Sequence, residues 1–466
     1  MAFGLFKKNN FADAIYYNAH IITQDSEYPE AEAVACKNGI IQAVGDNEYM
    51  DEFKGPDTEM VDLEGKYMYP GFINTKIPFV FQAFEKLCLH VDIEDDLESV
   101  LKQTAEYIEE NPDLDTYFVF GFNGNIFVDD DQEEIAARLD EMSQEVPIIL
   151  LDEIGTVFRM NSVAVVILAE TAEEECVEII TLPYVINLFL PFGYEESQEL
   201  AKEIMSDSLD MGFASVICQG TPSYMNDAFL NALLQIHSEE DLKQRYIFSQ
   251  MQQYVITKGS VGYMLVDRQT SCVELGDQVS YQFLNVRLNS LTEWNRDGLL
   301  EMCKDAIERG FNVVIDAPDK DFCHLAFDVF NQIREDGLLK PVLAVGIPED
   351  VEVDFEDEFM HSDKILTTSY LEQENDIFVR AHSTKEALDK LTLDAAEFLG
   401  MSDVLGSIEP DKYADFTVFN ENILDFSLEK FTHPHAEMVI VAGIKTYDAE
   451  EESQNEMFDM MSQSQF

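Results

Sequence analysis

The sequence is poor in basic residues and lacks long apolar runs, and each shortage excludes a class of protein. Its 466 residues include 29 Lys and Arg against 92 Asp and Glu, which gives a formal net charge of −63. A surface of that sign repels phosphate backbones and anionic lipids, so we expect neither nucleic acid nor a membrane as a partner. It attracts cations and basic proteins weakly and in a salt-dependent way. No run of about 18 apolar residues occurs, so no membrane-spanning helix is predicted.

Two origins of this acidity stay open. One is a salt-loving host, and the other is a solvated acidic surface with no specific role. The 33 Phe, 18 Met and seven Cys indicate a core without restraint on bulky residues, which favours the second.

Disulfide and metal-knuckle patterns are also missing. The cysteines are odd in number and dispersed without CxxC spacing, so they predict reduced and mostly buried thiols. No secretory signal is predicted, because Lys7 and Lys8 follow a very short apolar run, where a signal has the reverse order. We therefore expect a cytoplasmic protein. The cysteines are Cys36, Cys88, Cys176, Cys218, Cys272, Cys303 and Cys323.

Both ends of the chain have the composition of short strands. Near the N-terminus, Asn38-Gly39 separates two apolar runs, which is typical of a tight hairpin. Strand-like runs reappear near the C-terminus at 414–419 and 438–443. Neither set buries a face alone, so we predict one small β-sandwich domain built from residues 10–68 and 405–447.

The middle of the chain alternates short apolar runs with amphipathic segments. Residues 297–309 and 322–333 carry apolar side chains at helical spacing, with charges on the opposite face. This alternation indicates an α/β fold, and we predict a (β/α)8 TIM barrel over residues 69–404. The tail at 448–466 is acidic and is predicted to be disordered. The expected strands include 118–121, 147–151, 214–218, 312–315 and 341–345.

One motif points to a family. Residues 65–78 end in Pro70-Gly71-Phe72-Ile73-Asn74-Thr75-Lys76-Ile77-Pro78. This segment resembles the first barrel strand of the amidohydrolase superfamily, which reads Pro-Gly-Phe-Ile-Asp-x-His-x-His. Further segments resemble the branch typified by N-substituted formamide deformylase, in the same order along the chain: 139–162, 211–216, 310–317 and 384–416. The resemblance implies the barrel, the composite β-sandwich and a homo-oligomer.

The resemblance also implies a divalent metal such as zinc, but the ligand positions differ. The two histidines of the first strand correspond to Lys76 and Pro78, and two further histidines correspond to Thr156 and Asp316. Proline has no side-chain donor atom, and a protonated lysine repels a cation. The candidate for the last barrel strand, 365–369, has no aspartate. We therefore expect no metal and no other cofactor.

The remaining candidate residues lie at the predicted mouth of the barrel. Asp316 and Asp319 follow a predicted strand, although neighbouring Asp321 has the alternative role of capping a helix. Lys76 is expected to replace the charge of the metal through an ion pair with Asp316 or another carboxylate at the mouth, the alternative being that it points to solvent. Asn74 and Arg287 complete the candidate ligand-binding set. The only His-x-His, His433-Pro434-His435, is expected to have a surface or packing role. The acidic run 129–131 is expected to cap a helix.

Two functions remain open from the sequence. The first is a non-catalytic or repurposed amidohydrolase-like protein, a pseudoenzyme that binds a small molecule or a protein partner. The second is a hydrolase that acts on a carbon–nitrogen bond of a small amide with a rebuilt site. There Asp316 or Asp319 serves as general base, and Lys76 or Arg287 stabilises an oxyanion.

Overall fold

The computed structural model describes most of the chain, with gaps. The described residues are 11–75, 88–92, 94–127, 132–152, 158–174, 185, 188–189, 194–218, 223–239, 241–251, 253–257, 260–264, 273–274, 278–288, 295–339, 342–347, 366–369, 381–431 and 434–454. No helix in these ranges is both long and apolar enough to cross a membrane.

The two ends of the chain meet in one sheet. This sheet has the order β24-β23-β22-β7-β2-β3, and β22 from the C-terminal part pairs with β7 from the N-terminal part. A second sheet, β5-β4-β1-β6, shares a hydrophobic core with it, in which Tyr16 and Val34 lie with Met68 and Phe416. The strands are β1 (Ala14–Tyr17), β2 (His20–Ile22), β3 (Glu30–Ala31), β4 (Ala33–Lys37), β5 (Ile40–Gly45), β6 (Glu59–Asp62), β7 (Tyr67–Pro70), β22 (Phe416–Phe419), β23 (Met438–Val441) and β24 (Ile444–Asp448).

The predicted hairpin turn is confirmed. Strands β4 and β5 pair antiparallel, and Asn38 and Gly39 between them have φ values of 52° and 76°. Two consecutive positive φ angles are what a two-residue hairpin with the favoured twist requires, and Asn-Gly tolerates them best.

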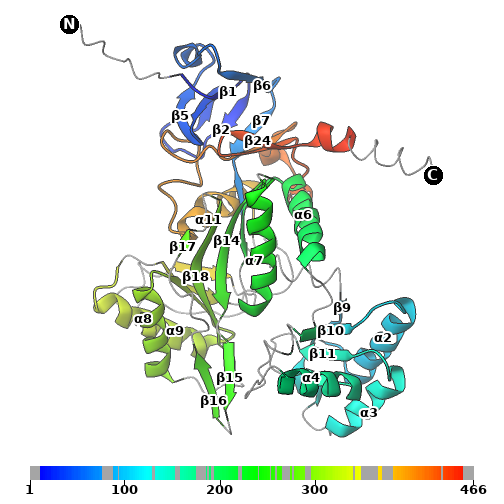
Figure 1. Ribbon diagram of the computed structural model, residues 1–466. Helices are drawn as coiled ribbons and strands as arrows, with labels where there is room; N and C mark the ends of the chain where they lie inside the picture. The colour runs from blue at the N-terminus through cyan, green and yellow to red at the C-terminus, as the bar shows by residue number, and fades with distance from the viewer. Residues whose placement is uncertain are drawn as a thin grey trace, which may run out of the picture.

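A second region is a sheet of parallel strands with the order β21-β20-β19-β18-β14-β13-β8. All its neighbouring strands pair in parallel, and the sheet is a half-barrel in the described part of the chain (Figure 1). The strands are β8 (Phe72–Asn74), β13 (Phe213–Cys218), β14 (Arg245–Met251), β18 (Val279–Arg287), β19 (Asn312–Asp316), β20 (Leu343–Ile347) and β21 (Leu366–Ser369). The short β17 (Val273–Glu274) pairs with β18, and β15 (Gln253–Thr257) and β16 (Ser260–Met264) form a separate hairpin.

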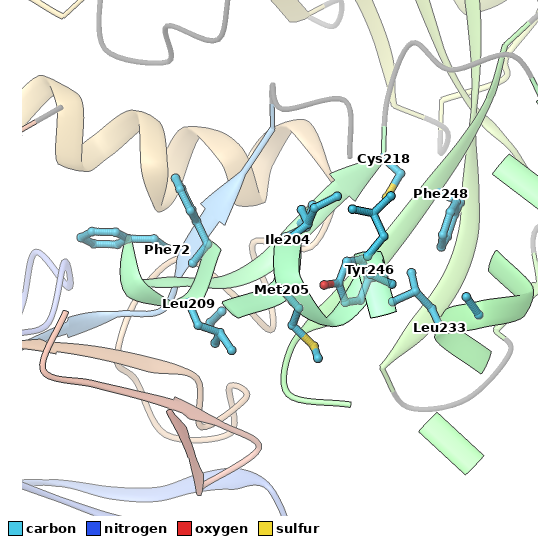
Figure 2. Packing of buried hydrophobic residues seen from close by; sticks show 14 of the residues in the cluster. Phe72, Ile204, Met205, Leu209, Cys218, Leu233, Tyr246 and Phe248 are labelled. Atoms are coloured by element: carbon cyan, nitrogen blue, oxygen red, sulfur yellow. The ribbon is translucent and has the colours of Figure 1, made fainter. Parts of the chain in front are cut away.

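Helices cover the outer face of this half-barrel. Figure 2 shows Ile204 and Met205 of α6 (Tyr194–Asp210) and Leu233 of α7 (Ser223–Ser238) among Cys218 and Tyr246 of the sheet. Helices α8 (Arg296–Glu308) and α9 (Lys320–Glu335) cover β18, β19 and β20. The inner face carries one apolar side chain from each of six strands, and these pack with α11 (Leu393–Phe398), which follows α10 (Thr384–Leu391). The six are Ile73, Ile217, Ile247, Phe283, Val314 and Ala344.

The chain passes from the terminal sheet into the half-barrel at Gly71, between β7 and β8. A Cβ at this position would lie 2.7 Å from Ala214 Cβ and 3.1 Å from Asp415 Cβ. The Gly71 N–H also donates to the Asp415 carbonyl, at 2.8 Å. The Pro-Gly of the opening motif therefore marks a position where two regions approach too closely for a side chain.

A third region differs from the single barrel that the sequence predicts. Strands β10 (Tyr117–Phe122) and β11 (Ile148–Asp152), expected in the barrel, instead lie in a four-stranded sheet with the order β12-β11-β10-β9. None of its strands pairs with a described strand of the half-barrel (Figure 1). We call residues 88–174 the acidic lobe. Its other elements are β9 (Leu89–His90), β12 (Phe158–Met160), α2 (Leu97–Glu110), α3 (Gln132–Met142) and α4 (Ser162–Glu174).

The beginning of the acidic tail is ordered, in contrast to the expectation. Asp448 ends β24, and residues 449–454 are helical. Lys445 Nζ lies 2.7 Å from Glu451 Oε1, and Lys243 Nζ lies 3.4 Å from Glu452 Oε1. These ion pairs hold the segment against the body. The rest of the tail lies outside the described residues.

Candidate functional site

The candidate site lies on the inner face of the half-barrel, at the carboxyl edge of β18, β19 and β20. Side chains alternate along a strand, so Asn285 lies on the same face as Phe283, and Asp316 lies on the same face as Val314. Asp316 is the last residue of β19 and its side chain is 1% exposed. Parallel strands present their carboxyl ends at one edge, where barrel proteins place their sites.

Asp316 has different neighbours on its two sides. Its register partner on β18 is Arg287, and its partner on β20 is Gly346. A Cβ built on Gly346 would lie only 2.1 Å from Asp316 Oδ1. The carboxylate therefore occupies the space above β20 that any other residue at 346 would fill. The sequence analysis did not identify Gly346, although a glycine inside the apolar run 341–347 indicates a close approach.

Asn285 is a second polar group that the sequence analysis missed. Its side chain is 0% exposed, and neither Nδ2 nor Oδ1 has a hydrogen-bond partner within the described part of the chain. The Oγ atom of Ser215 on β13 is likewise buried without a hydrogen-bond partner within the described residues. A buried amide without partners costs roughly 1–3 kcal/mol, so these atoms are the ones that a bound molecule or water satisfies. The available signal was a polar residue at an inward position of an otherwise apolar strand.

The other predicted site residues are placed in part. Asn74 ends β8 at the same carboxyl edge and is 1% exposed. Arg287 is placed by its register opposite Asp316, and its side chain lies outside the description. Lys76 falls in 76–87, outside the described residues, as do Pro78 and Thr156. The predicted ion pair of Lys76 with Asp316 therefore stays a prediction.

Asp319 has a structural role at the start of α9 (Lys320–Glu335). It is exposed, and its carboxylate accepts a hydrogen bond from the Phe322 N–H at 3.0 Å, which makes it the N-cap of α9. The sequence analysis assigned the cap to Asp321, which instead lies in the first turn of this helix. A carboxylate at that position interacts favourably with the helix dipole and needs no ligand to explain it. Of the three predicted acids, Asp316 is buried, whereas Asp319 and Asp321 are exposed.

The described residues around Asp316 do not fit a catalytic divalent metal. Such a site needs three or more N, O or S ligands that converge on one point. No group of three His, Cys, Asp or Glu side chains that could hold a metal occurs in the described ranges. The two register neighbours of Asp316 are an arginine, which has no acceptor atom, and a glycine.

His435 of the His-x-His segment lies away from the half-barrel mouth. Its Nδ1 lies 2.7 Å from Asp210 Oδ2 on the surface, at the end of α6. The Tyr447 hydroxyl donates to Asp210 Oδ1 at 3.0 Å, so this contact joins the terminal sheet to α6. The surface role expected for His435 agrees with this placement. His433 and residues 129–131 lie outside the described ranges.

Comparisons with known proteins relate this chain to the amidohydrolase superfamily. A model of the amidohydrolase family matches residues 343–447. The exoenzymes regulatory protein AepA of Pectobacterium carotovorum is 34% identical over 152 residues, which cover 32% of this chain and 33% of that protein. YtcJ of Bacillus subtilis, which carries the name of an amidohydrolase, is 30% identical over 115 residues, covering 24% and 22% of the two chains. The matched regions thus span at most about a third of these relatives.

The fold has relatives among solved structures. An uncharacterized metal-dependent hydrolase from Pyrococcus horikoshii superposes with a TM-score of 0.60 at 16% identity, covering 91% of this chain and 100% of that one. At this identity the similarity concerns the fold. The mixed α/β fold and the partial sequence similarity agree with the resemblance that the opening motif carries.

Proposed function

We propose that this chain is an amidohydrolase-like protein without the metal site of the family, and that it binds a small molecule or a partner at the carboxyl edge of the half-barrel. The observation that carries the proposal is the environment of Asp316, whose neighbours in register are Arg287 and Gly346. Neither neighbour has a side-chain acceptor atom that could join Asp316 in binding a cation.

Asn285 supports binding at this face. A carboxamide offers two donor hydrogens and an acceptor oxygen. The Nδ2 and Oδ1 atoms of Asn285 are both buried without a hydrogen-bond partner among the described residues. Together with Asp316, this group provides hydrogen bonds but no cluster of metal ligands. A site of this kind holds a ligand in one orientation and supplies no metal-activated water.

The finer points of the fold form part of the same proposal. We infer that the half-barrel is part of a (β/α)8 barrel, and that the two terminal sheets form a β-sandwich. The deformylase branch is supported by the resemblance of the segments 139–162, 211–216, 310–317 and 384–416. The acidic lobe interrupts the chain between β8 and β13, the first two strands of the half-barrel in chain order.

The first test is the metal content of protein purified without chelator. After exhaustive dialysis we expect zinc, iron and manganese far below one equivalent by inductively coupled plasma mass spectrometry. A stoichiometric metal that resists dialysis contradicts the proposal.

The second candidate function is hydrolysis of a carbon–nitrogen bond in a small amide with a rebuilt site. The burial of Asp316 favours it, because a buried carboxylate can act as a general base. A panel of N-acyl and N-formyl amides separates the two functions. A compound that raises the melting temperature of the parent but not of Asp316→Asn, without turnover, indicates binding. Turnover that vanishes in Asp316→Ala indicates an enzyme. Asp321→Asn is the matched control for charge, since Asp321 is exposed on α9.

A further inference from the structure

The acidic lobe carries an unusual helix face. Helix α4 buries Ala164, Leu168 and Ala172 against the lobe, at a spacing of four residues. Beside this buried face, Val165 and Val166 of α4 are 48% and 54% exposed.

The exposed residues of α4 form a continuous stripe. Ser162, Val165, Val166 and Ala169 follow the spacing i, i+3, i+4 and i+7, and all are exposed. This is the spacing at which one helix presents a face to another. No charged residue occurs between 162 and 169, whereas 26% of the whole chain is charged. We call these four residues the α4 stripe.

The neighbouring helices α2 and α3 expose charged residues, in contrast to the uncharged stripe of α4. The outer face of α3 exposes Glu133, Glu134 and Glu141. The exposed pair on α2 is Lys102 with Glu106, at 3.4 Å. An ordinary solvent-facing helix in this lobe is therefore charged, and α4 alone among its three helices places adjacent large aliphatic side chains in water.

The charge around the stripe restricts what can cover it. Residues 88–174 contain 23 Asp and Glu against three Lys and Arg, a net charge of 3 − 23 = −20. The stripe ends at the exposed Glu170, and Asp140 accepts hydrogen bonds from the Ser162 N–H and hydroxyl at its start, at 2.7 and 2.6 Å. A second copy of the lobe or an anionic membrane would meet like charge at this rim.

We propose that the α4 stripe docks a basic amphipathic helix, whose apolar face covers Val165 and Val166 and whose Lys or Arg residues meet the acidic rim. The contact is small, because two valines and an alanine supply most of it, so the complex is weak and exchanges rapidly. The proposal concerns the acidic lobe and does not depend on the function of the half-barrel.

The experiment uses the full-length protein and a synthetic helical peptide with leucines at i, i+3, i+4 and i+7 and lysines elsewhere. Binding is followed by fluorescence anisotropy at about 150 mM salt, where long-range attraction is screened. We expect the peptide to bind the parent, and we expect Val166→Asp to weaken binding at least about fivefold. Val166→Asp adds a negative charge to the protein. If the peptide were held by charge attraction alone, this variant would bind it more tightly than the parent, whereas docking on the apolar stripe predicts weaker binding.

Ala137→Asp is the matched control, since Ala137 is exposed on α3 in the same lobe and gains the same charge off the stripe. We expect its affinity for the peptide to equal or exceed that of the parent. Circular dichroism melting of both variants checks the fold. The proposal is overturned if Val166→Asp binds the peptide as tightly as Ala137→Asp, or if a version with glutamate in place of lysine binds equally well. It is also overturned if sedimentation shows a dimer of the parent that Val166→Asp dissolves, because a second copy is then the occupant.

Discussion

Arg245 and Asp415 form a buried ion pair that joins the half-barrel to the terminal sheet. Arg245 Nε lies 2.6 Å from Asp415 Oδ2, and Nη2 lies 3.2 Å from Oδ1. The Asp415 carboxylate also accepts the Ala442 N–H at 2.8 Å, and the Arg245 guanidinium lies 4.3 Å from the centre of the Tyr413 ring. Arg245 begins β14 and Asp415 precedes β22, so one pair connects segments 170 residues apart.

Breaking this pair is expected to destabilise the whole protein. Arg245→Met leaves the Asp415 carboxylate buried without its counter-charge, which typically costs about 3–5 kcal/mol. The measurement is urea unfolding followed by circular dichroism. Combining Arg245→Met with Asp415→Leu removes both charges and should recover part of the loss.

An exposed ion pair provides the control. Lys202 Nζ lies 2.9 Å from Asp241 Oδ2, with both side chains more than 40% exposed. Lys202→Met should change the free energy of unfolding by only about 0–1 kcal/mol. Equal losses for Lys202→Met and Arg245→Met would show that the buried pair has no special role.

Asn161 is predicted to hold the acidic lobe together. Its Oδ1 accepts the N–H groups of Ile148 and Ala164, both at 3.1 Å, and its Nδ2 donates to the carbonyls of Ser143 and Val146, both at 3.0 Å. Asn161→Ala leaves several buried backbone groups unpaired, and we expect a loss of about 2–4 kcal/mol. Thermal melting measures the loss, and faster hydrogen exchange at the Ile148 amide locates it in the lobe.

Asn111→Ala is the comparison for this effect. The half-buried Asn111 side chain donates one hydrogen bond, to the Tyr107 carbonyl at 2.9 Å, and its loss should cost no more than about 1 kcal/mol. If Asn161→Ala and Asn111→Ala lower the melting temperature equally, the four hydrogen bonds of Asn161 stabilise the protein no more than the single hydrogen bond of Asn111.

The parts of the fold that the sequence predicts are those fixed by local chemistry. Asn38-Gly39 predicts its hairpin because few other residues accept two positive φ angles in succession. The Pro70-Gly71 motif predicts the passage into the half-barrel because Gly71 meets Ala214 too closely for a side chain. In both places a single residue type satisfies the backbone.

The parts that the sequence misplaces depend on tertiary context. The apolar runs of β10 and β11 look the same in a barrel and in a separate mixed sheet, so their pattern does not reveal the acidic lobe. The cap of α9 is Asp319 and not Asp321, a shift of two residues that propensity does not resolve. Asn285 and Gly346 gain their meaning only from the register that aligns β18, β19 and β20.

The described cysteines are expected to be unreactive in the native protein. Burial raises the pKa of the Cys303 thiol to about 12 and that of Cys323 to about 11, and it raises the pKa of Cys36, Cys88 and Cys218 further. The thiolate is the reactive form, so these five should resist iodoacetamide at pH 8 while all seven react in guanidinium. Mass spectrometry of tryptic peptides assigns the sites. Alkylation of Cys303 or Cys218 as fast as in the denatured chain contradicts the burial.

These raised pKa values also predict a loss of stability at alkaline pH. The folded state keeps each thiol protonated, whereas the unfolded chain releases the proton above its ordinary pKa of about 8.5. The contribution is therefore fully present below that pH and is lost as the pH rises through the folded value, near 12 for Cys303. Melting temperatures measured from pH 8 to 11 should fall steadily. A flat profile contradicts the expectation.

We propose that Lys76 supplies the positive charge that a metal provides in the family. This prediction rests on the resemblance, in which position 76 corresponds to the first histidine of the family motif. Lys76→Met should lower the melting temperature, and the loss should shrink in an Asp316→Asn background if the two groups interact. Lys76→His with Pro78→His should leave the metal content unchanged. If the decreases in melting temperature caused by Lys76→Met and Asp316→Asn simply add in the double variant, the two residues do not form an ion pair.

Gly346 and Asp316 allow the most direct test of the site geometry. An alanine at 346 places its Cβ 2.1 Å from Asp316 Oδ1, so the carboxylate must rotate away from β20. Forcing a buried side chain from its position typically costs about 1–3 kcal/mol. The φ of Gly346 is not among the positive values, so the backbone itself accepts alanine. In an Asp316→Ala background the displaced carboxylate is gone, and Gly346→Ala should then cost far less. A double-mutant cycle of urea unfolding measures this coupling. If Gly346→Ala costs the same in both backgrounds, the Asp316 carboxylate does not lie above β20, and the environment on which the proposed function rests is wrong.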